Sequence, residues 1–211
     1  MKEKRLAKII GITLGIVLIF LIYLIISPYF LSKKETLSND ILDINGSKYN
    51  AAKKIELALE ELKSRRQEAS IIKGVDTTEK VVAITFDDLA DYKSMESILE
   101  LLDLYSAKAT FFIPGIKGAE DPSIVERILD KKQEIGNYTL SGIRQMELLS
   151  EKELVRDFCL SGAILKEMIG KEPTILKCSG TKYTKELLEV ADACGIENVI
   201  ESTHLFNYQS F

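Results

Sequence analysis

The sequence predicts an α/β protein: a distorted, incomplete (β/α) barrel of parallel strands, preceded by a transmembrane helix and a helical stalk. Three observations lead to this prediction. From residue 80 onward, short apolar runs rich in β-branched residues alternate with amphipathic helical segments, and repeated βα units form parallel sheets or barrels. An almost purely apolar run fills residues 9–26. Residues 50–69 have the periodicity of a helix.

The N-terminal segment has the composition of a membrane anchor. Lys2, Lys4, Arg5 and Lys8 precede the apolar run, and about 20 apolar residues span the bilayer core as a helix. Because basic residues favour the cytoplasmic side, we expect residues 1–34 to form a cytoplasmic tail and a single-pass plasma-membrane anchor, with the rest extracytoplasmic. A cleaved signal peptide is the alternative, but its apolar region would be shorter and would end in a small-x-small cleavage site.

Residues 35–75 are predicted to be a polar linker followed by the stalk helix. Ile55 and Leu62 fall on one helical face, and Glu61 with Arg65 has the i,i+4 spacing of a helical ion pair. The sequence leaves two arrangements open, because this helix could project as a stalk or dock on the domain that follows. A coiled-coil dimer would need more heptads than the segment contains.

Residues 76–211 hold the alternating strands and helices of one predicted domain. Ser150 and Glu153 have capping-box spacing at the start of its longest helix, and Gly195 ends its last one. A closed barrel normally has more strands than this segment supplies, so we expect a domain that is incomplete at its C-terminus and exposes a sheet edge. Strands are predicted at 81–86, 109–113, 134–138, 174–177 and 198–200, and helices at 93–105, 123–132, 150–169 and 185–194.

The composition excludes some classes of protein. The net charge of −4 argues against a nucleic-acid partner, which would require a basic face. Three cysteines in 211 residues are too few for a dense disulfide scaffold. Cys159 and Cys194 fall in helical segments, where cysteine most simply serves as a small buried apolar residue.

Two adjacent carboxylates, Asp87 and Asp88, follow the first predicted strand of the domain. In barrel-type α/β folds, functional sites are built at the C-terminal ends of the strands. Carboxylates there can hold a metal ion or act as a general base. The structural alternative is that one of them caps the next turn while the other is solvated.

Three segments of the domain carry a family resemblance. Residues 81–88 read VVAITFDD, residues 107–113 read AKATFFI and residues 133–141 read QEIGNYTLS. In order and spacing they resemble the signature blocks of the polysaccharide deacetylase superfamily, the NodB-homology domain of chitooligosaccharide and peptidoglycan deacetylases. The resemblance covers residues 80–204. It implies a hydrolase of non-peptide carbon–nitrogen bonds, which removes N-acetyl groups from glycans in carbohydrate and cell-wall metabolism.

The resemblance also assigns site positions. Asp87 stands where the family has its catalytic base, and Asp88 where it has a ligand to a divalent metal, usually zinc. Asn137 fits the frame of the next motif. Tyr138 and Gly142, however, occupy the positions of that motif's two metal-binding histidines.

The later motifs are less well matched. Lys177, followed by Cys178, stands at the position of the family's arginine. Lysine keeps the positive charge but not the bidentate fork, and we expect it to form a structural ion pair with Asp87 or Asp88. The family's tryptophan motif has no counterpart, and its catalytic acid histidine would lie beyond Phe211.

The replaced histidines bear directly on the chemistry. A catalytic zinc site needs about three protein ligands. Tyr138 offers only a phenol, with an ordinary pKa of about 10, and Gly142 offers no side chain. We therefore expect no zinc cofactor unless further ligands exist, and a domain that has lost zinc-dependent catalysis.

Several functions stay open at this point. The expected partners are the membrane and N-acetylated glycans, and the domain could be a residual deacetylase, a non-catalytic glycan-binding or scaffold module, or a truncated product without function. A thiol nucleophile formed by Cys178 and His204 is a further alternative, because a Cys–His pair can activate a thiol.

Overall fold

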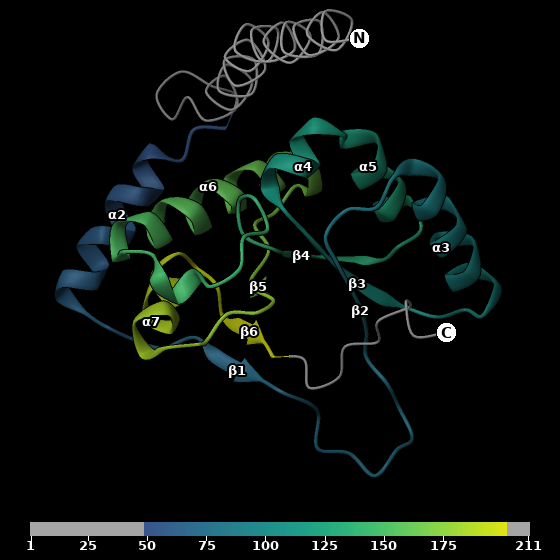
Figure 1. Cartoon of the computed structure of the whole chain (residues 1–211), viewed down its shortest axis with the longest axis horizontal. Coiled ribbons are helices and arrows are strands. Elements are labelled where there is room, and N and C mark those ends of the chain that lie inside the picture. The colour runs from purple at the N-terminus through teal and green to yellow at the C-terminus, as the bar shows by residue number, and fades with distance from the viewer. Residues whose placement is uncertain (1–48, 202–211) are drawn as a thin grey trace, which may run out of the picture. The chain divides into compact units, whose positions relative to one another are not determined.

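The computed structural model describes residues 49–201. These residues form an α/β unit built on a six-stranded parallel sheet, with strand order β1-β6-β5-β4-β3-β2. The helices lie in an arc along one side of the curled sheet (Figure 1). The strands are β1 (Ser70–Ile72), β2 (Ile84–Asp87), β3 (Ala109–Ile113), β4 (Glu134–Asn137), β5 (Ile175–Leu176) and β6 (Asn198–Ile200). The helices are α2 (Ala52–Ser64), α3 (Tyr92–Leu104), α4 (Gly115–Glu120), α5 (Pro122–Asp130), α6 (Glu151–Ile169) and α7 (Lys185–Ala193), with a short 3-10 helix η1 (Met146–Leu148).

Two sequence predictions fall outside the described part of the chain. The anchor predicted for residues 1–34 is one of them, and the role considered for His204 is the other. Between residues 49 and 201, no helix is both long and apolar enough to cross a membrane.

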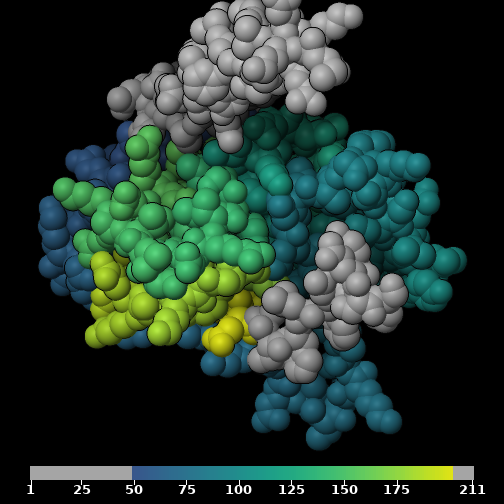
Figure 2. All heavy atoms as spheres, viewed as in Figure 1, coloured from purple at the N-terminus to yellow at the C-terminus, as the bar shows by residue number. Residues whose placement is uncertain are grey.

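The predicted strands and helices of the domain are confirmed, with ends that shift by a few residues. The prediction missed β1, which pairs in parallel with β6 and forms the far edge of the sheet. The segment from 73 to 83 connects β1 to β2 at the opposite edge; it is exposed throughout and projects from the body of the unit (Figure 2). The expected incomplete barrel of parallel strands is therefore observed as a curled sheet with two separate edges.

Helix α2 docks on the unit instead of projecting from it. Its buried residues Ala58 and Leu62 pack into one core cluster with Phe158 of α6 and Val190 of α7. Arg66, just after the helix, pairs with Glu151 at 2.7 Å and with Glu189 at 2.9 Å. Helix α2 and strand β1 thus belong to the same compact unit as the strands and helices that follow them.

Helix α6 is the central support of the fold. Its Ser150–Glu153 capping box, predicted from the sequence, is present in full. The helix contributes Phe158 to the core cluster shared with α2 and α7, and Leu165 to a second cluster shared with α3, α5 and β3. One long helix thus holds both halves of the sheet, which fixes the ends of β4 and β5 relative to each other.

Close packing between strands makes Gly136 difficult to replace. A Cβ atom at this position in β4 would lie 2.5 Å from Cε1 of Phe112 and 3.1 Å from Cγ1 of Ile175. We expect Gly136→Ala to lower the free energy of unfolding by about 1–3 kcal/mol, the usual effect of overpacking a core. Urea unfolding measures the change. Gly74→Ala is the matched control, because no atom lies within 4 Å of its added Cβ, and equal stability of the two variants would contradict this packing.

Candidate functional site

The residues singled out from the sequence lie close together at the C-terminal ends of the strands. Asp87 ends β2, Asn137 ends β4, and Lys177 follows β5 directly. The register aligns Asp87 with Phe112 of the neighbouring strand β3 and Asn137 with the last residue of β5. Because all the strands run parallel, these ends lie at the same edge, as the sequence predicted.

Lys177 reaches across the inside of the curl to β2. Its Nζ lies 2.7 Å from Oδ1 of Asp87 and donates to Oγ1 of Thr85 at 3.0 Å. The Asp87 contact is an ion pair by distance and not an aligned hydrogen bond. The ammonium nitrogen of Lys177 also lies over the Phe112 ring, 5.6 Å from the ring centroid. In a flat sheet β5 and β2 would lie roughly 14 Å apart at about 4.8 Å per strand, so the ion pair requires the curvature. The predicted pairing of Lys177 with one of the two aspartates is confirmed.

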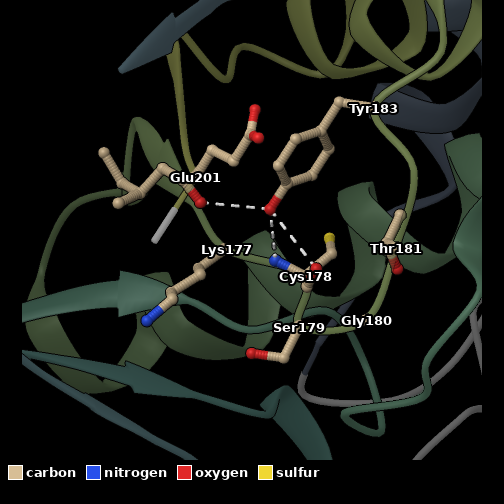
Figure 3. A pocket seen from close by; sticks show the side chains of 8 residues that line it. Lys177, Cys178, Ser179, Gly180, Thr181, Tyr183 and Glu201 are labelled. Atoms are coloured by element: carbon tan, nitrogen blue, oxygen red, sulfur yellow. Dashed lines mark hydrogen bonds between the residues drawn. The ribbon is translucent and has the colours of Figure 1, made fainter. Parts of the chain in front are cut away.

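Ser179 completes the surroundings of the Asp87 carboxylate. Its hydroxyl donates to Oδ2 of Asp87 at 2.6 Å. Lys177 and Ser179 point to the same side of the segment after β5 (Figure 3). Asp87 is thus held by a lysine and a serine from the same segment.

Asp88 is held by a lysine that the sequence reasoning missed. It has a left-handed backbone (φ 75°), and its Oδ1 accepts from the backbone N–H of Leu89 at 2.8 Å. Its Oδ2 accepts from Nζ of Lys117 at 2.7 Å. Lys117 lies on α4, which packs so closely on α6 that a Cβ at Gly115 would lie 2.9 Å from Oγ of Ser161. Only its position in the sequence could have identified Lys117 as a site residue. It lies in the connection after the strand at 109–113, and barrel folds place site residues in such connections.

Tyr138 fills space at the two positions where the resemblance places histidines. The side chain is buried, and burial is the main reason that its pKa lies above the usual value for a phenol, although interaction with the Ser179 hydroxyl opposes the shift. Gly142 has a left-handed backbone (φ 71°), and a Cβ there would lie 3.4 Å from two ring atoms of Tyr138 and 3.3 Å from Cγ of Pro114. The tyrosine ring therefore packs directly against the glycine.

Side chains of helix α6 form hydrogen bonds with the loop that carries Tyr138. Oγ of Ser161 lies 2.7 Å from both Oδ1 of Asn137 and the carbonyl oxygen of Thr139. Asn137 is buried, and its Nδ2 has no hydrogen-bond partner among the described residues. Asp157 accepts from the backbone N–H of Leu140 at 2.8 Å. No local pattern predicted these hydrogen bonds, because only the fold brings their partners together.

The Asp157 carboxyl makes a testable contribution to pH dependence. Desolvation by burial raises its pKa to about 7, although the hydrogen bond from Leu140 acts in the opposite direction. An aspartate in the unfolded chain has a pKa near 3.9. The unfolded chain therefore loses this proton first, so the group disfavours folding increasingly as pH rises from about 4 to 7, and fully above that. Below about pH 4 the penalty is absent.

We expect Asp157→Asn to remove this penalty while keeping an acceptor for Leu140. Relative to the wild type, the variant should gain stability between pH 5 and pH 8, by roughly 2–4 kcal/mol at the upper end. Urea unfolding of both proteins at each pH measures the difference. A stability difference that does not change with pH would show that the buried carboxyl does not titrate in this range.

Cys178 is placed as a structural residue. Its backbone N–H donates to Oη of Tyr183 at 3.0 Å, and Oη also lies 3.1 Å from the carbonyl oxygen of Ile200 (Figure 3). Burial holds the pKa of the Cys178 thiol well above its usual value, which disfavours the thiolate that a nucleophile needs. These residues line a cavity of about 220 Å³ at the ends of β5 and β6, whose lining is Lys177, Cys178, Ser179, Gly180, Thr181, Tyr183, Ile200 and Glu201.

The carboxylates of the site do not form a cluster of metal ligands. Within residues 49–201, no three histidine, cysteine, aspartate or glutamate side chains lie where they could share a metal ion. Asp87 and Asp88 are instead each paired with a lysine. The arrangement offers ammonium, hydroxyl and phenol groups around two neutralised carboxylates.

Comparison with known proteins agrees with the family resemblance. The family model for polysaccharide deacetylase matches residues 74–199, more than half of the chain. A peptidoglycan-N-acetylglucosamine deacetylase from Bacillus cereus is 32% identical over 130 residues, which cover 62% of this chain and 60% of the relative. The peptidoglycan-N-acetylmuramic acid deacetylase PdaC from Bacillus subtilis is 30% identical over 146 residues, 68% of this chain and 30% of the relative. The chain thus spans about three fifths of the Bacillus cereus protein.

Solved structures show the same fold. The Bc1960 peptidoglycan N-acetylglucosamine deacetylase superposes with a TM-score of 0.57 at 28% identity, over 63% of this chain and 61% of that chain. BA3943, a CE4 family pseudoenzyme from Bacillus anthracis, superposes with a TM-score of 0.58 at 21% identity, over 64% of this chain and 47% of that chain. With its signature segments brought to one edge of the same curled parallel sheet, the chain belongs to the polysaccharide deacetylase family.

Proposed function

We propose that this chain is a non-catalytic member of the family, which binds N-acetylated glycans of the cell wall without zinc-dependent deacetylation. The observation that carries the proposal is the pairing of both site carboxylates with lysines of the same chain, each at 2.7 Å: Asp87 with the buried Lys177, and Asp88 with Lys117 in a solvent-exposed pair. An aspartate that neutralises an ammonium is less available to a metal ion. The charge that a cation would supply is already present in the fold.

The donor set does not fit the zinc ion that the family implies. Asp88 is the only ligand position that keeps its side-chain type, and its Oδ2 is engaged by Lys117. A catalytic zinc ion needs about three protein ligands and favours imidazole nitrogen, but the histidine positions hold the buried ring of Tyr138 and the bare backbone of Gly142. The residues at these positions therefore do not supply the ligand set that a catalytic zinc ion needs.

The ligand class follows from the relatives and from the polar groups of the site. The relatives from Bacillus cereus and Bacillus subtilis are named for N-acetylglucosamine and N-acetylmuramic acid in peptidoglycan. The hydroxyls of Ser179 and Thr181 are partly exposed beside Lys177 at the cavity after β5. Such groups can form hydrogen bonds with the hydroxyls and acetamido groups of a sugar chain without turnover.

The chain's place in the cell is part of the proposal. The basic and apolar N-terminal segment supports a single-pass anchor, and the positive-inside rule supports an extracytoplasmic domain facing the wall glycans. Protease added to intact protoplasts should then remove the domain from the membrane. Full protection of the domain would show the opposite orientation.

Glycan binding without turnover tests the functional proposal. The full chain, purified in detergent, should bind N-acetylglucosamine oligomers in calorimetry, and binding should weaken in Ser179→Ala, which removes a hydroxyl at the site. Ser97→Ala is the control, because it removes a hydroxyl from an exposed serine of α3 that does not line the cavity. Metal-dependent release of acetate would overturn the proposal, whereas absence of any binding would favour the alternative of a scaffold.

A further inference from the structure

Two of the three cysteines lie against each other in the core, away from any role in the proposed site. Sγ of Cys159, on α6, lies 3.2 Å from Sγ of Cys194, the C-cap residue of α7. Both side chains are almost completely buried, with 0% and 2% of their surface exposed. The backbone of Cys178, the third cysteine, forms hydrogen bonds with the Tyr183 hydroxyl.

The contact joins two helices that the rest of the core also holds together. Cys159 and Cys194 belong to the cluster in which Phe158 of α6 packs with Leu187 and Val190 of α7. The cysteines lie 35 positions apart in the sequence, and the chain between them includes β5. Since α6 and α7 are fixed by this packing, the two sulfurs stay adjacent whatever their oxidation state.

We propose that Cys159 and Cys194 form an intramolecular disulfide when the chain folds under oxidising conditions, and so make a covalent link between α6 and the end of α7. The reaction is thiol–disulfide exchange with a small-molecule or protein disulfide. The two thiols lose two protons and two electrons as the S–S bond forms, and the donor disulfide is reduced to two thiols. A bonded pair lies at about 2.05 Å, so the sulfurs must approach each other by a side-chain adjustment and not by a rearrangement of the helices.

Burial decides when the exchange can occur. The hydrogen bond with Cys159 and desolvation together raise the pKa of the Cys194 thiol well above its usual value, and the thiolate is the form that attacks a disulfide. In the packed state the thiols are also shielded from a donor. We therefore expect the bond to form while α6 and α7 are still assembling, and to be slow to form in protein that has already folded reduced.

The link would secure the strand that carries the site. The loop that it closes contains β5 and the segment with Lys177 and Ser179. A cross-link over a loop of this length restricts the unfolded chain. For a unit of this size we expect the melting temperature to rise by roughly 5–15 °C on oxidation.

Refolding in a glutathione redox buffer tests the proposal. The full chain is reduced in denaturant, refolded in detergent with reduced and oxidised glutathione, and then alkylated in denaturant for mass spectrometry. We expect one alkylated cysteine, Cys178, together with a peptide pair joining Cys159 to Cys194. Treatment with reductant should restore three alkylated cysteines and lower the melting temperature.

Matched variants separate this disulfide from other pairings. Cys178→Ser should keep both the cross-linked peptide pair and the rise in melting temperature. Cys194→Ser should abolish both, and the wild type refolded in reductant provides the reference if that variant folds poorly. Three alkylated cysteines after oxidative refolding, or a cross-link that includes Cys178, would overturn the proposal. Because this test needs neither glycan nor zinc, its result does not depend on the proposed function.

Discussion

Replacing Tyr138 and Gly142 together with histidine should raise the affinity of the chain for zinc by orders of magnitude. The change adds two imidazoles beside the Asp88 carboxylate and so restores an Asp-His-His set. Replacing Tyr138 also removes the ring atoms that lie 3.4 Å from a Cβ at position 142. Part of the gain is lost to backbone strain, because Gly142 has a φ of 71° and an L-residue there costs roughly 1–2 kcal/mol.

Lys117 provides a second step in the same experiment. Its Nζ occupies Oδ2 of Asp88 at 2.7 Å, so adding Lys117→Ala to the double variant should raise zinc affinity further. Tyr138→Phe with Gly142→Ala is the matched control, since it changes the same positions without supplying ligands. Deacetylation should stay slow even with zinc bound, because no general acid has been added, and general acid–base catalysis contributes about 10²–10⁴-fold. Equal zinc affinities for the histidine variant and the control would show that the loop does not present the two side chains to Asp88.

Removing the Lys177 ammonium should cause the largest loss of stability at the site. Lys177 is only 4% exposed and Asp87 20%, so Lys177→Met leaves a largely buried carboxylate with Ser179 as its remaining side-chain partner. Breaking a buried pair costs about 3–5 kcal/mol, and the partial exposure of Asp87 places the expected loss near the lower end. Methionine keeps an unbranched apolar chain over the Phe112 ring, so the loss reports on the charge.

A double-mutant cycle isolates this interaction. Asp87→Asn in the Lys177→Met background should recover much of the stability, because it removes the unpaired charge. Lys73→Ala is the control for an exposed pair, since Lys73 lies 3.2 Å from Glu201 with 62% of its side chain exposed, and its effect should stay within about 1 kcal/mol. Thermal or urea unfolding is measured for the wild type, Lys177→Met, Asp87→Asn and the double variant, and for Lys73→Ala. An equally small effect of Lys177→Met would contradict the structural role of the pair.

Local patterns in the sequence determined much of the fold. The strand at Ala109–Ile113 and the capping box at Ser150 were predicted at the observed residues. β1 was missed because three residues at the end of a helical pattern carry too little periodicity to mark a strand. The docking of α2 was left open, because the residues that bury Ala58 and Leu62 lie far away in the sequence on α6 and α7.

Some residues of the site could be predicted from the sequence and others could not. Asp87, Asp88, Tyr138 and Lys177 could be chosen because each closes or follows a predicted strand, and parallel strands bring such positions together. Lys117 and Asp157 could not, because their roles depend on side chains reaching from α4 and α6 to other segments. The ion pair of Lys177 was predicted, but its choice of Asp87 over Asp88 depends on how strongly the sheet curls.

We propose that two lysines of the chain, Lys177 and Lys117, pair with the carboxylates of this site in place of a metal ion. The most direct test of this proposal is the zinc content of the wild-type chain after dialysis, measured together with acetate release from N-acetylglucosamine oligomers. The structure leads us to expect substoichiometric zinc and no metal-dependent acetate release, because Asp88 is paired with Lys117 and the histidine positions hold Tyr138 and Gly142. Near-stoichiometric zinc with metal-dependent turnover would contradict the account.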